Sequence, residues 1–177
     1  MVTTHFEFYK GAVLYEVNIR QYTPEGTFKS FARHLPRLKQ MGINVLWLMP
    51  VHPIGVVNRK GKLGSYYAIS NYHEVNPEFG TKHDLKELIE IAHANGMKII
   101  LDWVANHVAT DHVWSVDHPD YLETNADGSF HSPYGWSDVI QINHKNEQAH
   151  RAMIAEMTYW VEEFDIDGFR ADLAHLT

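Results

Sequence analysis

Two short stretches of the sequence place charged side chains next to apolar ones in a way that suggests chemistry. In the first, residues 164–175, Arg170 and Asp172 lie two positions apart, so in a strand both point to the same face. Burying an arginine beside an aspartate is costly unless the two groups pair and hydrogen-bond. Such a pair is therefore either a structural ion pair or part of a site, and the pair alone leaves both readings open.

The second stretch follows the same pattern. Residues 97–101 form an apolar run that stops at Asp102, and Asn106 and His107 follow. In parallel α/β proteins the active site forms at the C-terminal ends of the strands, from the loops that follow them. The polar residues of the two stretches are therefore expected to meet at one edge of a sheet. The residues expected to converge are Asp102, His107, Arg170 and Asp172.

The elements that would position these residues follow from the apolar pattern. Strands are predicted at 13–18, 43–49, 97–102 and 167–171. Helices are predicted from Thr27 to Gly42, from Thr81 to Asn95 and over 147–164, by their apolar spacing and their caps. A strand and a helix thus alternate along the chain, which predicts an α/β fold with a parallel sheet.

Four strands do not complete a (β/α)₈ barrel of TIM type, which needs eight strands and about 250 residues. The last predicted strand would also be left with an unpaired edge, which barrels remove by closing. The sequence therefore predicts a half barrel, with residues 1–177 as the N-terminal part of a longer barrel protein.

The segments Asp102-Trp-Val-Ala-Asn106-His107 and Gly168-Phe-Arg170-Ala-Asp172 together resemble the first two signature regions of the α-amylase family, glycoside hydrolase family 13. Residues 15–22, 45–55 and 64–80 are similar to the early barrel segments of the same family, so the resemblance covers nearly the whole chain. Either motif alone is weak, but both in order are specific. The resemblance implies a retaining hydrolase of α-glucans such as starch, with a small inserted subdomain at 108–143.

The family also implies roles for individual residues. Asp172 would be the nucleophile, and Arg170 would keep it ionised and oriented. His107 would bind a sugar hydroxyl, and Tyr67 would stack on the sugar next to the cleaved bond. Asp102 would orient this wall of the site, although a purely structural hydrogen bond at a strand end is an equal alternative.

Three tyrosines of the long loop 51–80 are candidates for carbohydrate contact: Tyr66, Tyr67 and Tyr72. Aromatic rings stack on the apolar faces of sugars, while a phenol can still hydrogen-bond. A loop of this length is usually functional. Packing within the loop is the alternative for each of the three.

The sequence departs from the family pattern after the nucleophile. The family often has Lys-His at the third and fourth positions after it, whereas here these are His175 and Leu176. His175 stays a candidate for substrate binding. Asn106 is a candidate ligand of a structural calcium ion, since calcium takes oxygen ligands, and the departure weakens that expectation. The family's general-acid glutamate belongs on a later strand, so the 177-residue chain is expected to be inactive alone.

Two other function classes remain open. The first is a metal-dependent barrel hydrolase with Asp102, His107, Asp172 and His175 as ligands. Arg170 would then face the metal, which is unfavourable for a cation. The second is a half barrel without catalysis that binds carbohydrate or associates with itself.

Composition excludes some partners. The chain has 177 residues, of which 45% are hydrophobic and 21% charged, and its net charge of −7 gives no basic surface for nucleic acid or an anionic membrane. The expected partner is an α-glucan or maltooligosaccharide. There is no cysteine, so the redox compartment is undetermined. Residues 1–10 show neither a signal peptide nor an anchor, but a trimmed secreted protein would look the same.

Overall fold

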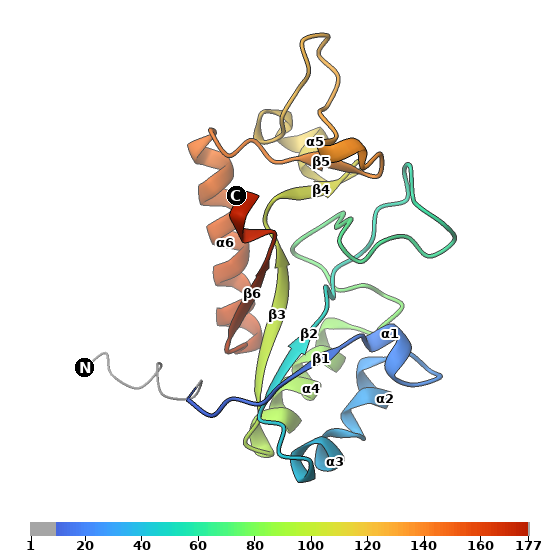
Figure 1. The fold of residues 1–177 in the computed structure, drawn as a ribbon, viewed down its shortest axis with the longest axis vertical. Coiled ribbons are helices and arrows are strands. Elements are labelled where there is room, and N and C mark those ends of the chain that lie inside the picture. Colours follow the sequence, from blue (N-terminus) through green and yellow to red (C-terminus); the bar gives the residue numbers. More distant parts are fainter. Residues whose placement is uncertain (1–9, 177) are drawn as a thin grey trace, which may run out of the picture.

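The computed structural model describes residues 10–176, so most of the segment searched for a signal peptide lies outside the described residues. Its centre is a four-stranded parallel sheet in the order β1, β2, β3, β6 (Figure 1). The strands are β1 (Leu14–Val17), β2 (Val45–Leu48), β3 (Lys98–Val104) and β6 (Gly168–Asp172). The predicted parallel α/β half barrel is confirmed, because all three strand pairs are parallel and in the expected order.

The two faces of this sheet differ in chemistry. On one face the paired residues are apolar and most of those in β2 and β3 are fully buried, as with Leu46 beside Ile99, and Trp103 continues this face with 1% of its surface exposed. They pack in one cluster with the helix residues Phe31 and Leu88. Because side chains alternate along a strand, the opposite face receives the intervening residues. These include Glu16, Trp47, Ile100, Asp102, Arg170 and Asp172.

The helix predicted from Thr27 to Gly42 is in fact two helices, α2 (Phe28–Ala32) and α3 (Leu35–Gln40). Pro36 explains the break, since proline lacks an N–H and its ring clashes with the carbonyl four residues earlier. The predicted ends are right. Thr27 caps α2, and Gly42 follows α3 at φ +84°, a left-handed conformation that favours glycine. A short helix after β1 was not predicted, α1 (Ile19–Tyr22).

The two longer helices begin where the sequence predicts. In α4 (Lys82–Ala94) the capping box is confirmed: the Thr81 hydroxyl accepts from Asp84 N at 3.2 Å, and the Asp84 carboxylate accepts from Thr81 N at 2.8 Å. In α6 (Glu147–Phe164) the Asn146 side chain accepts from Gln148 N at 2.8 Å. No helix within residues 10–176 has the length and hydropathy that crossing a membrane requires.

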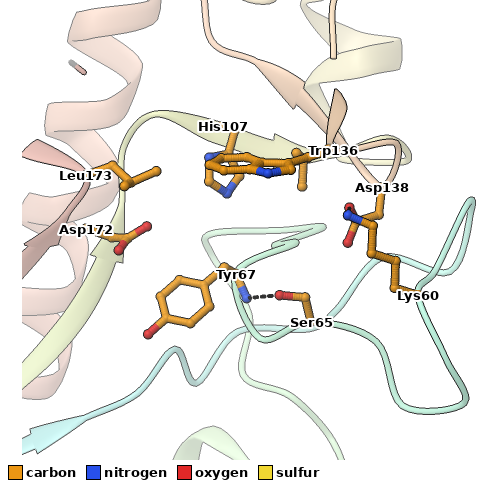
Figure 2. A pocket seen from close by; sticks show the side chains of 9 residues that line it. Lys60, Ser65, Tyr67, His107, Trp136, Asp138, Asp172 and Leu173 are labelled. Atoms are coloured by element: carbon orange, nitrogen blue, oxygen red, sulfur yellow. Dashed lines mark hydrogen bonds and ion pairs between the residues drawn. The ribbon is translucent and has the colours of Figure 1, made fainter. Parts of the chain in front are cut away.

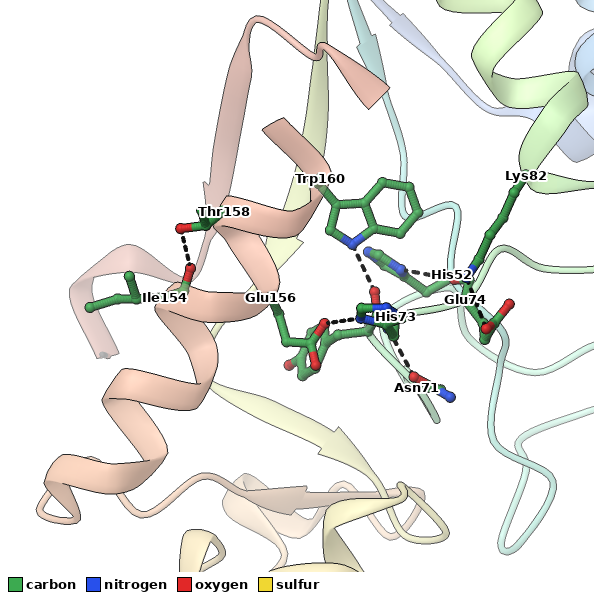
Figure 3. A network of polar contacts seen from close by, with 10 residues as sticks. His52, Asn71, His73, Glu74, Lys82, Ile154, Glu156, Thr158 and Trp160 are labelled. Atoms are coloured by element: carbon green, nitrogen blue, oxygen red, sulfur yellow. Dashed lines mark hydrogen bonds and ion pairs between the residues drawn. The ribbon is translucent and has the colours of Figure 1, made fainter. Parts of the chain in front are cut away.

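The long loop 51–80 is held in place by α6 (Figure 3). The Trp160 indole Nε1 donates to the Tyr72 carbonyl oxygen at 2.7 Å, and His73 Nδ1 lies 3.0 Å from Glu156 Oε2. Lys82, at the start of α4, pairs with Glu74 at 2.9 Å. These contacts join the loop to α4 and α6, so the loop has a fixed position although it forms no regular helix or strand.

The segment after β3 has more regular structure than the sequence predicts. A two-stranded antiparallel sheet joins β4 (His107–Ala109) to β5 (Val139–Gln141). Between them lie α5 (Trp114–Asp117) and two 3₁₀ turns, η1 (Pro119–Tyr121) and η2 (Pro133–Gly135). A third turn, η3 (Ala174–Leu176), follows β6. The insertion sits above the C-terminal ends of the parallel strands (Figure 1), and β4 includes His107, one residue before the predicted boundary at 108.

Candidate active site

The register between β3 and β6 brings the charged residues together. Asp102 pairs with Arg170, and Val104 pairs with Asp172, so all three charged side chains lie on one face. The sequence predicts that the strand ends at Asp102. In the structure β3 continues through Trp103 to Val104, so Asp102 lies inside the strand. Continued pairing with β6 explains the extension, and it buries Asp102 completely.

Asp102 is surrounded by donors that compensate for its burial. Trp47 Nε1 donates to Oδ2 at 3.2 Å, the Tyr67 hydroxyl donates to the same oxygen at 3.1 Å, and Arg170 Nη1 donates to Oδ1 at 3.0 Å. Burial raises the pKa of the Asp102 carboxyl, and the bonds from Arg170 and Tyr67 oppose this rise. Asp102 thus fixes the orientation of Trp47, Tyr67 and Arg170 through hydrogen bonds.

Arg170 links Asp102 to Asp172, the predicted nucleophile. The same nitrogen, Nη1, lies 3.0 Å from Asp102 Oδ1 and 2.9 Å from Asp172 Oδ1. The guanidinium also lies over the Trp47 ring, with 4.7 Å from Cζ to the ring centroid. Two carboxylates and one aromatic face therefore fix the position of Arg170. The prediction that Asp102, Arg170 and Asp172 lie close together is confirmed.

His107 joins this group from β4. Its Nδ1 lies 3.1 Å from Asn106 Oδ1, and since an amide oxygen only accepts, Nδ1 carries the proton. Burial lowers the pKa of His107, although the charges of Asp172 and Asp138 oppose this. The imidazole is therefore neutral near pH 7, and its Nε2 is an acceptor.

A cleft of about 330 Å³ opens beside these residues (Figure 2). Figure 2 shows the strand-end residues on one side, the aromatic residues in the middle and an ion pair on the far side. The lining residues are Asp172 and Leu173 at the strand end, Tyr67, His107 and Trp136 in the middle, and Lys60, Ser65, Asp138 and Val139 opposite. The volume suits a small ligand.

Of the three candidate tyrosines, Tyr67 lines the cleft. Burial raises the pKa of its hydroxyl, and so does the nearby Asp102 carboxylate, so the phenol stays protonated and donates. The expectation was wrong for Tyr72, which is 1% exposed and stacks on Trp103 at 5.1 Å between ring centroids. Tyr66 packs under the Arg20 guanidinium at 4.4 Å and does not line the cleft.

The lining residues that were not predicted include Lys60, Ser65, Trp136 and Asp138. They belong to irregular segments where no periodicity marks which side chains face inward. Trp47 was also missed, because it reads as one apolar residue of a buried strand. A signal for it exists, since the alternation of side chains along β2 puts it on the face that carries Asp102.

Asn106, the candidate calcium ligand, and His175, the candidate for substrate binding, do not line the cleft. His175 is exposed on η3 and does not line the cleft, so its role in substrate binding stays a prediction. Asn106 is buried, its Oδ1 faces His107, and its Nδ2 donates to the Leu176 carbonyl oxygen at 3.1 Å. The role of Asn106 as a calcium ligand stays a prediction.

The metal-hydrolase alternative lacks its ligand set. Within residues 10–176 no group of three or more histidine, aspartate or glutamate side chains is arranged to hold a metal ion. Arg170 lies between Asp102 and Asp172, where such an ion would have to bind.

Comparison with known proteins identifies the family. The family profile described as "Alpha amylase, catalytic domain" matches residues 15–133. The chain belongs to the alpha-amylase family. Its fold is similar to that of an alpha-amylase from Lactobacillus plantarum, with a TM-score of 0.91 and 41% identity over 94% of this chain. A maltogenic alpha-amylase from Thermotoga neapolitana gives a TM-score of 0.90 and 43% identity over 96% of this chain. The predicted resemblance is thus confirmed.

This chain matches only part of the length of these relatives. It spans 39% of the L. plantarum chain and 40% of the T. neapolitana chain. It also spans 37% of Alpha-amylase 3 from Dictyoglomus thermophilum, with 30% identity over 193 residues. The four-stranded sheet therefore corresponds to part of the amylase barrel.

Proposed function

We propose that this chain provides the nucleophile side of a retaining α-glucan hydrolase, with Asp172 as the nucleophile. One observation carries the proposal: Arg170 Nη1 binds Asp172 Oδ1 at 2.9 Å and the buried Asp102 at 3.0 Å, beside a cleft lined by aromatic residues. A carboxylate held in this way by a fixed guanidinium has one orientation.

The chemistry follows from the free oxygen of that carboxylate. Because Arg170 holds Oδ1, Oδ2 is the oxygen that would attack the anomeric carbon and form a glycosyl ester as the glycosidic bond breaks. Retention needs a second carboxyl group about 5 Å away, which protonates the leaving oxygen and then activates water. In the family this acid is a glutamate on a later strand.

The middle of the cleft would hold the sugar. Tyr67 and Trp136 both line it and offer aromatic faces for the C–H faces of a glucose ring. The His107 Nε2 acceptor would take a hydrogen bond from a sugar hydroxyl. Asp102 acts as a positioning residue, because its contacts are to Trp47, Tyr67 and Arg170. The substrate class supported best is an α-glucan or maltooligosaccharide.

The proposal is tested by trapping the glycosyl ester. A chain carrying the complete barrel is incubated with a fluorinated glucosyl fluoride that forms the ester quickly and releases it slowly. Mass spectrometry of the digested protein should find the added sugar on Asp172. A sugar on any other carboxylate would overturn the assignment.

A second proposal concerns the 177-residue chain by itself. The inward face of the sheet is partly open, with Leu14 49% exposed and the Arg170 side chain 37% exposed. Such a face, next to an unpaired strand edge, favours association of two half barrels. The isolated chain should self-associate and should not cleave maltooligosaccharides, because nothing protonates the leaving oxygen.

Light scattering and an assay on one preparation test this second proposal. Supplying the remaining barrel strands as a separate chain should restore cleavage. A stable monomer would refute the edge argument, and cleavage by that monomer would show that the acid lies within this chain.

A further inference from the structure

The far end of the cleft is crossed by an ion pair that the proposed catalytic steps do not use. Lys60 Nζ, from the loop 51–80, lies 2.7 Å from Asp138 Oδ1, from the insertion just before β5. Both residues line the cleft, and Figure 2 shows them on the side opposite Asp172 and Leu173, with Tyr67 and Trp136 between. The pair thus joins the loop 51–80 to the insertion.

The two partners of the ion pair differ in burial, and this difference favours the contact between them. The Asp138 side chain is 6% exposed, whereas the Lys60 side chain is 52% exposed. Removing the partner of a buried charge is strongly unfavourable, because the charge is then left without compensation. Lys60 therefore stays bound to Asp138, although its own exposure would otherwise leave it free to move.

The backbone under Lys60 is also fixed to the insertion. The Asp111 carboxylate accepts from Val56 N at 2.8 Å and from Val57 N at 3.2 Å. The Thr110 hydroxyl donates to the Val57 carbonyl oxygen at 2.7 Å. Arg59 folds back onto the carbonyl of Gly55, with Nε 2.7 Å from the oxygen.

Gly55 allows this close approach. A Cβ atom at Gly55 would lie 2.3 Å from Asp111 Oδ1 and 2.5 Å from Ala109 Cβ, which is too close for any side chain. The Asp138 end is anchored too, since its backbone carbonyl accepts from Thr110 N at 3.3 Å. These contacts hold the chain segment before Lys60 and the backbone of Asp138 in place on either side of the bridge.

We propose that the Lys60–Asp138 ion pair is a specificity-determining barrier that closes the cleft opposite Asp172, so that a glucan chain binds there by its end. This inference rests on the proposed function, because it concerns which glucans reach Asp172. A chain that fills the cleft from Asp172 past Tyr67 and Trp136 meets the bridge. The middle of a long chain would need the groove to continue through the space that Lys60 occupies.

The test uses a chain carrying the complete barrel and maltooligosaccharides with a bulky blocking group at one chain end or the other. For each variant, kcat/KM is measured on the blocked and the unblocked substrates. The parent protein should discriminate against one of the blocked forms. In Lys60→Ala that discrimination should fall by about tenfold or more, the size of effect that a steric wall ordinarily gives.

Two variants make the result specific. Lys60→Arg keeps the charge and the reach to Asp138, so it should retain the discrimination. Lys62→Ala changes a lysine of the same loop that does not line the cleft, so it should behave like the parent protein. Lys60→Ala leaves the buried Asp138 without its partner, so a thermal melt of each variant checks folding alongside the kinetics.

The outcomes separate this inference from the proposed function. If no variant cleaves any maltooligosaccharide, the proposed function fails. If the parent protein cleaves unblocked substrate but accepts both blocked forms equally, or if Lys60→Ala discriminates as strongly as the parent, the bridge is purely structural and the inference is overturned.

Discussion

The cleft has two walls that are built in different ways. The strand wall presents Asp172 to the cleft, with Arg170 and the buried Asp102 behind it, and the pairing of β3 with β6 sets their positions. The loop wall consists of Lys60, Tyr67, Trp136 and Asp138, which come from the loop 51–80 and the insertion. The strand wall is fixed by backbone register, and the loop wall by side-chain and loop contacts.

This difference assigns separate roles to the walls. The strand wall concentrates charge, with one guanidinium between two carboxylates. The loop wall offers aromatic faces and one ion pair, and it meets the strand wall through the hydrogen bond from Tyr67 to Asp102 at 3.1 Å. Changes in the strand wall should therefore affect the chemical step most, and changes in the loop wall should affect binding and specificity.

The largest expected effect is that of Asp172→Asn in a chain carrying the complete barrel. The amide has the same shape but cannot form the glycosyl ester, so kcat should fall by roughly 10⁴-fold or more. Steady-state kinetics on maltooligosaccharides and a thermal melt measure turnover and folding separately. The matched control is Asp117→Asn, an exposed position away from the cleft. Near-normal turnover by Asp172→Asn would show that Asp172 does not take part in the chemical step.

Arg170→Lys should have the next largest effect. A lysine ammonium is a point charge and does not reproduce the planar guanidinium that reaches both carboxylates and covers Trp47. We expect kcat to fall by about 100-fold, the range for losing a preorganised charge contact. Arg151→Lys, in an exposed pair with Glu147, is the control. If both substitutions cost the same, Arg170 has only a structural role.

Acid should weaken the core beneath the loop wall. His52 and His112 are fully buried there, and burial lowers their pKa values to about 4 and about 3. The unfolded chain binds these protons near pH 6.5, so between pH 6.5 and about 4 it holds more protons than the folded chain. This contribution to stability is therefore complete above pH 6.5 and is lost as the pH falls.

Denaturant unfolding measures that loss. From pH 7 to pH 5.5 the free energy of unfolding should fall by roughly 1 kcal/mol for each histidine, or about 2 kcal/mol in all. His52→Phe, in a pocket lined by Tyr72, Trp103 and Trp160, should remove about half of this dependence. His83→Gln, at an exposed position, should leave the dependence unchanged. A flat profile in the parent protein would contradict the argument.

Tyr67→Phe tests the contact between the walls and should have the smallest effect. It keeps the aromatic ring and removes the hydroxyl that donates to Asp102. Loss of a hydrogen bond to a carboxylate should lower kcat/KM by about tenfold. Tyr66→Phe, at the adjacent residue outside the cleft, should have no effect. Equal kinetics for the two variants would mean that the walls act independently.

The sequence by itself determined most of the strand wall and of the framework. The spacing of Arg170 and Asp172 implies a shared face, because side chains alternate along any strand. The start of α4 is equally local, since Thr81 and Asp84 bond to each other across three residues. Such features depend on short-range geometry, which the order of residues already contains.

The tertiary structure alone decided the loop wall. The family resemblance singled out Tyr67, but no local pattern separates it from Tyr66 or Tyr72. In the structure Tyr67 lines the cleft, Tyr66 packs under Arg20 and Tyr72 is buried against Trp103. Lys60 and Asp138 are 78 positions apart and meet because the loop 51–80 and the insertion are held against each other. An irregular segment has no period that assigns its side chains to a face, so its contacts with distant parts of the chain decide what it contributes.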